Sequence, residues 1–134
     1  MVEITNVFRS LKEVSKAEEI IQKVAFLTGD DSMSLFIIAL NKNQTLPAHY
    51  HKKGIEIYYI LSGSAILTTT LFHPEKQLDI DVKTVIKGDA FSIPPFNIHQ
   101  IANHLAEIVI ILAIAPKNHN HIDRYFVELD LNSQ

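Results

Sequence analysis

The sequence predicts an all-β fold, an antiparallel sandwich or barrel, on three observations. Short runs rich in Ile, Val, Thr, Tyr and Phe recur at near-regular spacing, with turn residues between them. Little of the chain has helical periodicity. No internal repeat, low-complexity tract or Pro/Gly-rich linker divides the 134 residues, of which 47% are hydrophobic and 20% are charged. The chain is therefore expected to form one domain over residues 1–134, large enough to bury a core without disulfides.

The N-terminal region allows two interpretations. Ser15-Lys16-Ala17-Glu18 has the form of a capping box, and apolar residues follow it at helical spacing. A short helix or helical turn is expected there. Residues 20–28 are equally compatible with an extra strand that pairs with the segment after them.

The remaining elements are expected to be strands separated by turns. Gly29-Asp30-Asp31 is a turn signal that precedes the first long apolar run. Ile108 to Ala115 is apolar throughout, which is typical of a strand buried on both faces, and it is too short to span a bilayer. The expected strands are 33–40, 46–51, 55–61, 64–72, 78–86, 90–93, 97–103, 106–115 and 124–129.

Three histidines and one glutamate have the spacing of a metal site. His49 and His51 are two residues apart, so on a strand both side chains point to the same face. Lys52-Lys53-Gly54 is expected to turn the chain, and Glu56 opens the next strand, which would return its carboxylate to the two histidines. His99 must reach them from a separate strand.

The same residues carry a family resemblance. His49-x-His51-x4-Glu56-x6-Gly63 resembles the first cupin motif, and Gly88-x5-Pro94-x4-His99-x3-Asn103 is similar to the second. The motifs span about residues 43–103. The resemblance implies a small single-domain cupin: a double-stranded β-helix, or jelly-roll barrel, with a metal inside one end. His49, His51, Glu56 and His99 would be the metal ligands.

Two positions depart from the cupin pattern. Asn43 and Phe96 stand where the family has glycines. Asn tolerates left-handed backbone angles, so Asn43 is a mild change. A bulky Phe96 implies either a different turn or a side chain that projects near the mouth of the site.

The donor set restricts the cofactor to one divalent transition metal. Imidazole and carboxylate suit Fe, Mn, Ni, Co, Cu or Zn, and the ligand types do not choose among them. Four protein ligands leave one or two exchangeable positions on a five- or six-coordinate ion, as a catalytic metal needs.

Several other residues are expected around the metal. Tyr58 lies two residues after Glu56 and shares its face, so its hydroxyl is a candidate general acid or base, with a packing role as the alternative. Glu56 is a second candidate catalytic group if it leaves the metal. Asn103 is expected to brace a loop, and Phe91 and Ile93 to form apolar wall.

The other histidines are expected to lie outside the site. His119-Asn120-His121 is reminiscent of a second metal site, but its Asn-rich setting favours an exposed loop. The same interpretation applies to His73 and His104.

Composition limits the partners and the location. A net charge of −3 with scattered basic residues argues against a nucleic-acid surface, and no apolar segment is long enough for a membrane span. No secretory signal is visible, so residence in the cytoplasm is expected. The apolar run at Ile108 to Ala115 and the apolar N-terminal segment favour a homodimer, with coverage by the N-terminal segment as the alternative.

Three functions remain open at this point. The resemblance implies a metal-dependent enzyme acting on a small molecule, with a dioxygenase-type oxidoreductase as the leading class. The alternatives are a metal-dependent isomerase, lyase or decarboxylase that uses Tyr58 or Glu56 for proton transfer, and a cupin that binds a small ligand without turnover.

Overall fold

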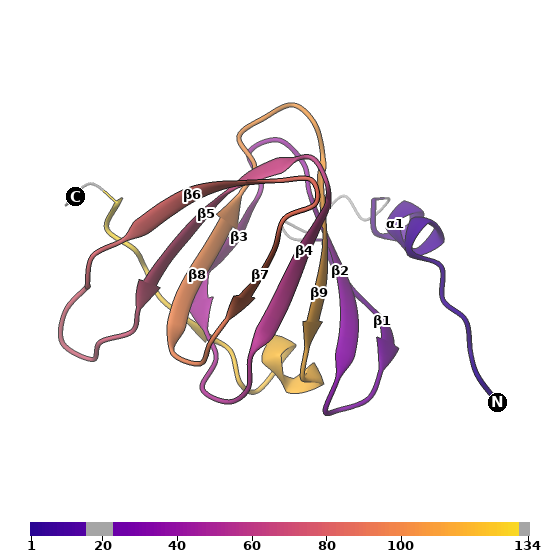
Figure 1. Cartoon of the computed structure of the whole chain (residues 1–134), viewed down its shortest axis with the longest axis horizontal. Coiled ribbons are helices and arrows are strands. Elements are labelled where there is room, and N and C mark those ends of the chain that lie inside the picture. The colour runs from indigo at the N-terminus through magenta and orange to yellow at the C-terminus, as the bar shows by residue number, and fades with distance from the viewer. Residues whose placement is uncertain (16–22, 132–134) are drawn as a thin grey trace.

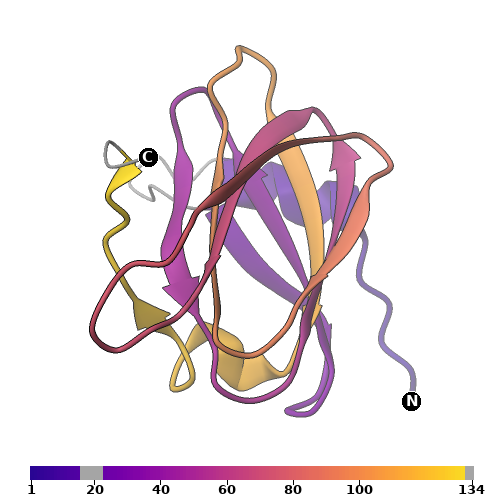
Figure 2. The ribbon, with the colours of Figure 1, turned by 60° about the vertical axis from the view of Figure 1, so that its left-hand side comes forward.

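The computed structural model describes residues 1–15 and 23–131, and in these ranges it contains two facing antiparallel sheets and one short α-helix (Figures 1 and 2). The sheet orders are β1-β2-β9-β4-β7 and β10-β3-β8-β5-β6, with five strands each. This order is that of a jelly roll, so the expected all-β fold is confirmed. The elements are α1 (Val7–Ser15), β1 (Lys23–Gly29), β2 (Ser34–Leu40), β3 (Thr45–Tyr50), β4 (Glu56–Ser62), β5 (Ser64–Leu71), β6 (Asp81–Ile86), β7 (Ala90–Ile93), β8 (Asn97–Ala102), β9 (Val109–Ala115), the 3₁₀ helix η1 (Lys117–Asn120) and β10 (Tyr125–Phe126).

The N-terminal region contains both a helix and a strand. The helix α1 ends at Ser15, where the capping box predicted that a helix would begin, and residues 16–18 of the box lie outside the described part of the chain. Asn6 caps the N-terminus of α1, because its side-chain oxygen accepts a hydrogen bond from the Arg9 backbone N–H at 3.1 Å. From residue 23 onward the strand interpretation is confirmed by β1. The helix packs Val7 and Leu11 on the outer face of the first sheet, beside β1 and β2 (Figure 1).

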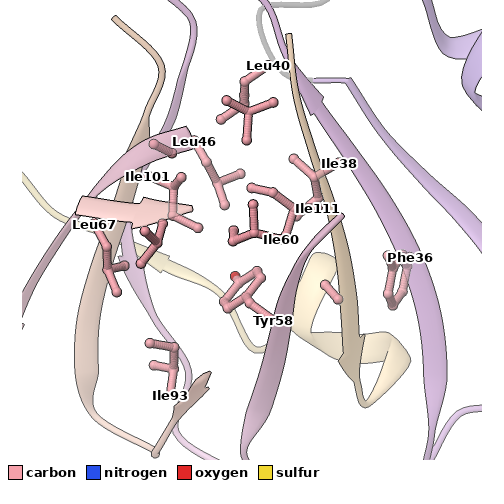
Figure 3. Close-up of a cluster of buried hydrophobic side chains, with 14 residues drawn as sticks. Phe36, Ile38, Leu40, Leu46, Tyr58, Ile60, Leu67, Ile93, Ile101 and Ile111 are labelled. Atoms are coloured by element: carbon pink, nitrogen blue, oxygen red, sulfur yellow. The ribbon is translucent and has the colours of Figure 1, made fainter. Parts of the chain in front are cut away.

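The core lies between the sheets and continues into the candidate site. Along β4, buried residues alternate with exposed ones, so Glu56, Tyr58 and Ile60 all face the interior. Figure 3 shows Tyr58 in the same cluster as Ile60 and Ile93. The polar side chain of Glu56 and the apolar side chain of Ile60 therefore lie on the same inner face of β4, and packing in the core holds the polar side chain in place.

The two positions that replace cupin glycines keep the glycine conformation. Asn43 has φ 65° and Phe96 has φ 63°. Of the two expectations for Phe96, a change in the turn is therefore not met. Its ring packs on the rings of Tyr50 and Phe72, at centroid distances of 6.0 and 6.4 Å. This packing, together with the hydrogen bond from Phe96 N–H to the His51 carbonyl at 2.8 Å, offsets the cost of a left-handed bulky residue.

Gly63 and Gly88 both have positive φ, so alanine substitutions at the two positions test whether Gly63 is also needed for lack of space. A Cβ on Gly63 (φ 80°) would lie 2.6 Å from the Ile108 carbonyl oxygen, whereas a Cβ on Gly88 (φ 94°) meets nothing within 4 Å. Gly88→Ala is expected to lower the free energy of unfolding by roughly 1–2 kcal/mol, the cost of the left-handed conformation. Gly63→Ala should cost at least about 1 kcal/mol more, because of overpacking. Urea unfolding measures both, and equal losses would contradict the predicted clash.

Candidate metal centre

The structure brings together the four residues whose spacing suggested a metal site. His49 lies on β3 and pairs directly with His99 on β8, while His51 follows β3 and Glu56 opens β4. All four are buried, and one ligand atom from each lies within 4.8 Å of the others. The hairpin at Lys52–Gly54 returns the carboxylate to the histidines because Gly54 adopts φ 77°.

Each of the three motif histidines uses one ring nitrogen to bind the backbone. A carbonyl oxygen only accepts hydrogen bonds, so each Nδ1 must carry the proton and each Nε2 retains a free lone pair. Metal-binding histidines are oriented in this way by their other nitrogen. The bonds are His49 Nδ1 to Pro47 O at 2.7 Å, His51 Nδ1 to Asp123 O at 2.5 Å, and His99 Nδ1 to Asn97 O at 3.0 Å.

Several buried polar atoms converge here without hydrogen-bond partners among the described residues. His51 Nε2 and Glu56 Oε2 are 2.7 Å apart, yet their geometry is not that of a hydrogen bond. An unpaired buried polar group costs about 1–3 kcal/mol, and a bound cation would satisfy this group of lone pairs. The donor set therefore fits a divalent transition metal. The unpartnered atoms are His51 Nε2, Glu56 Oε2, Tyr58 Oη, His99 Nε2 and His119 Nδ1.

The local electrostatics favour the ligating forms of these side chains. Burial lowers the pKa of His49 to about 3, and burial also lowers the pKa of His99, so both imidazoles are neutral near pH 7. Burial alone would raise the pKa of Glu56, but the neighbouring His119 and His51 outweigh it and hold that pKa below its usual range. Neutral imidazole and ionised carboxylate are the forms that bind a metal.

Tyr58 is fully buried beside the four donors. Its ring centroid lies 5.8 Å from that of His99 and 5.4 Å from that of Phe91. Burial, and then the negative charge of Glu56, raise the pKa of the Tyr58 hydroxyl well above its usual value. The hydroxyl therefore stays protonated at neutral pH and is suited to donate a hydrogen bond.

Asn103, the last residue of the second motif, braces the loop after β8 as expected. Its amide donates hydrogen bonds to the carbonyls of Leu40 and Glu107, at 2.9 and 2.7 Å. Its side-chain oxygen accepts one from the Leu105 N–H at 2.9 Å. Asn103, which follows β8, thus ties the end of β2 to the segment that leads into β9.

The expectation that His119 lies in an exposed loop is wrong. Its side chain is fully buried, its ring stacks on His51 with centroids 4.0 Å apart, and its Nδ1 lies 3.6 Å from Glu56 Oε2. His119 lies on η1, after both cupin motifs, and no local spacing in the sequence marks it as part of the site. His121 and His104 are exposed and His73 is half-buried, and none of them lies among the clustered donors.

A cavity of about 390 Å³ lies between β5, β6 and β7, and the four donor residues are not among those that line it. Three of its lining residues are direct cross-strand partners of site residues, so they belong to the same inner face. Phe91 and Ile93 form an apolar part of its wall, as expected, and side chains such as Lys83 add polar groups. The cross-strand pairs are Thr69 with His99, Phe91 with Tyr58, and Ile93 with Glu56.

Solved structures with the same fold are found at low sequence identity. An uncharacterized conserved protein with a double-stranded β-helix domain from Klebsiella pneumoniae is 15% identical, with a TM-score of 0.70 over 96% of this chain and 100% of that one. The capsular polysaccharide assembling protein CapF from Staphylococcus aureus is 17% identical, with a TM-score of 0.69 over 94% of this chain and 34% of CapF. Oxalate oxidase in complex with glycolate is 18% identical, with a TM-score of 0.66 over 83% and 57%.

These likenesses establish the double-stranded β-helix fold. The chain spans about a third of CapF and somewhat more than half of the oxalate oxidase. No curated protein matches the sequence. No helix in the described ranges is long and apolar enough to cross a bilayer. The family model described as Cupin matches residues 27–133, which include both motifs and the whole candidate centre. The chain belongs to the cupin family.

Proposed function

We propose that this cupin is a metal-dependent enzyme acting on a small organic molecule, with a dioxygenase-type oxidoreductase as the leading class. The observation that carries the proposal is the set of buried, unpartnered donor atoms, whose cross-strand neighbours line a cavity. Such an arrangement costs stability in the absence of a ligand, and costs of this kind are typical of functional sites.

The proposed ligands are His49, His51, Glu56 and His99. A divalent transition metal held by them would supply a Lewis acid with open positions for substrate oxygens and dioxygen. The fixed Nδ1 bonds to backbone carbonyls hold the three imidazoles ready, so little reorganisation accompanies binding. Glu56 remains ionised and contributes one negative charge to the site.

The neighbouring side chains support a small substrate with both apolar and oxygen-containing parts. Phe91 and Ile93 give the cavity an apolar wall, and Thr69, Asn97 and Lys83 add polar groups. Tyr58 is proposed to donate a hydrogen bond to a substrate oxygen, because its hydroxyl is protonated, buried and without a partner among the described residues. The fold is shared with an oxalate oxidase, so small carboxylic acids belong among the first candidates.

The test is oxygen consumption by the metal-loaded protein. Metal-free protein is reconstituted separately with Fe(II), Mn(II), Co(II), Ni(II), Cu(II) and Zn(II), then mixed with small dicarboxylic acids, hydroxy acids and catechols in an oxygen electrode. A dioxygenase consumes oxygen in proportion to product with at least one metal. No consumption with any metal and substrate contradicts this class.

A second function is favoured by the unpartnered Tyr58 hydroxyl. A metal-dependent isomerase, lyase or decarboxylase needs a group that moves a proton, and Tyr58 and Glu56 both face the interior of β4. Turnover under strict anoxia would support this class over the first. Tyr58→Phe is then expected to lower kcat about 100-fold or more, while the metal Kd stays within about twofold. A fully active Tyr58→Phe protein would rule out the proton-transfer role.

A cupin that only binds a ligand is the remaining alternative, and it would show thermal stabilisation by a ligand without product.

A homodimer is also proposed. Ile57, Tyr59 and Ile114 are 37–40% exposed on the outer face of β4 and β9, and Ile57 pairs directly with Ile114. Light scattering at low concentration tests the dimer, and a monomer mass would contradict it.

A further inference from the structure

The segment that starts with η1 folds against the turn between the first two ligands and Glu56. His119 Nε2 donates a hydrogen bond to the Lys53 carbonyl at 2.5 Å. Four residues later, Asp123 accepts hydrogen bonds from the N–H groups of Lys52 and Lys53, at 2.8 and 3.0 Å, and its carbonyl accepts one from His51 Nδ1. In both ribbon views the coil of η1 lies at the end of the sandwich where β9 finishes (Figures 1 and 2).

His119 follows the same bonding rule as the three motif histidines. One ring nitrogen is committed to a backbone carbonyl, and the other is buried, unpartnered among the described residues, and directed at the donor cluster. In His119 the free nitrogen is Nδ1, which lies 3.6 Å from Glu56 Oε2. The Glu56 carboxylate is therefore bounded by His51 on one side, at 2.7 Å, and by His119 on another.

His119 is not one of the four residues whose ligand atoms all lie within 4.8 Å of one another. The rings of His51 and His119 are stacked, with an interplanar angle of 5° and centroids 4.0 Å apart. Because the two rings are parallel and face each other, the free nitrogens of His51 and His119 point along separate planes rather than at one common point.

We propose that His119 is a positioning residue of the metal centre, acting from outside both cupin motifs. Its stacked ring fixes the ring plane of His51, and its bond to Lys53 fixes the turn that leads to Glu56. The inference rests on the metal centre of the proposed function and names no substrate. Groups that orient metal ligands typically change metal affinity 10–100-fold when they are removed.

The experiment uses Co(II), whose visible absorption reports coordination geometry and whose affinity is measured by calorimetry. His119→Ala is expected to weaken Co(II) binding about 10–100-fold and to change the absorption spectrum. His119→Phe keeps a flat ring on His51 but loses the bond to Lys53. It should keep a spectrum close to that of the wild type, with affinity lowered about 10-fold. The control is His121→Ala, an exposed histidine of the same segment, which should bind within about twofold of the wild type.

A merely structural role gives a different pattern. If the variants lose thermal stability but keep the wild-type Co(II) affinity and spectrum, the proposal is overturned. If His119→Ala fails to fold, His119→Phe decides, because wild-type affinity in that variant also overturns it. A wild-type protein that binds no Co(II) removes the metal centre itself, and with it this inference. A wild-type protein that binds Co(II) without any turnover overturns only the proposed enzymatic function.

Discussion

His99→Ala is expected to weaken metal binding about 100-fold. Structural zinc bound by four ligands in zinc-finger peptides contributes roughly 10–16 kcal/mol, which on that scale is about 3 kcal/mol for each ligand. Each 1.4 kcal/mol is a factor of ten in affinity. His99 should show this loss clearly, because it is fully buried and pairs directly with His49 across β3 and β8. Calorimetric titration of the metal-free protein with Co(II) or Mn(II) measures the change.

The matched control is His104→Ala. His104 is exposed, lies five residues after His99, and is not among the clustered donors. Its removal should leave the affinity unchanged, and circular dichroism should show that both variants keep the native fold. Equal affinity in His99→Ala and the wild type would show that the ion, if any, binds elsewhere.

Ile111→Ala is expected to lower the free energy of unfolding by about 2–5 kcal/mol. Ile111 is fully buried on β9 and lies opposite Ile38 and Ile60 in the two adjoining ladders. Removing its side chain would leave a cavity in the cluster that also contains Tyr58 (Figure 3), and closely packed sheets cannot collapse to fill it. Urea unfolding of the metal-free protein measures the loss without a contribution from bound metal.

Ile114 provides the control on the same strand. It is 39% exposed and faces outward, so in the monomer Ile114→Ala should cost less than about 1 kcal/mol. Because Ile114 also belongs to the proposed dimer face, both variants are compared at a concentration at which light scattering gives the mass of a monomer. The same substitution at two positions of β9 thus separates burial from strand propensity. Similar losses at both positions would contradict the inward orientation of Ile111.

Local patterns in the chain were sufficient to predict most of the strands. Along β4, buried and exposed residues alternate because successive side chains of a strand point to opposite faces of the sheet. The apolar run that forms β9 is typical of a strand with both faces covered. The N-terminal helix was expected to begin at Ser15, whereas α1 ends there and packs Val7 and Leu11 on the sheet. Such a short helix depends on packing against the sheet rather than on its own propensity.

At Phe96, the residue type alone led to a wrong prediction of the backbone conformation. A bulky side chain at a glycine position predicted a change in the turn, yet the backbone keeps φ 63°. The compensation comes from the rings of Tyr50 and Phe72, which are 46 and 24 residues away along the chain. Backbone preference is a local property, and contacts of this kind override it.

The sequence by itself determined the fold class, the cupin family and the residues able to form the centre, because strand periodicity and motif spacing are local quantities. Only the tertiary structure decided that His99 meets His49, that the cross-strand partner of Tyr58 lines a cavity, and that His119 is buried against Glu56. The bond from His119 to Lys53 spans 66 residues, and that from His51 to Asp123 spans 72. Contacts at such separations depend on how the sheets close on each other, which no local pattern of residues encodes.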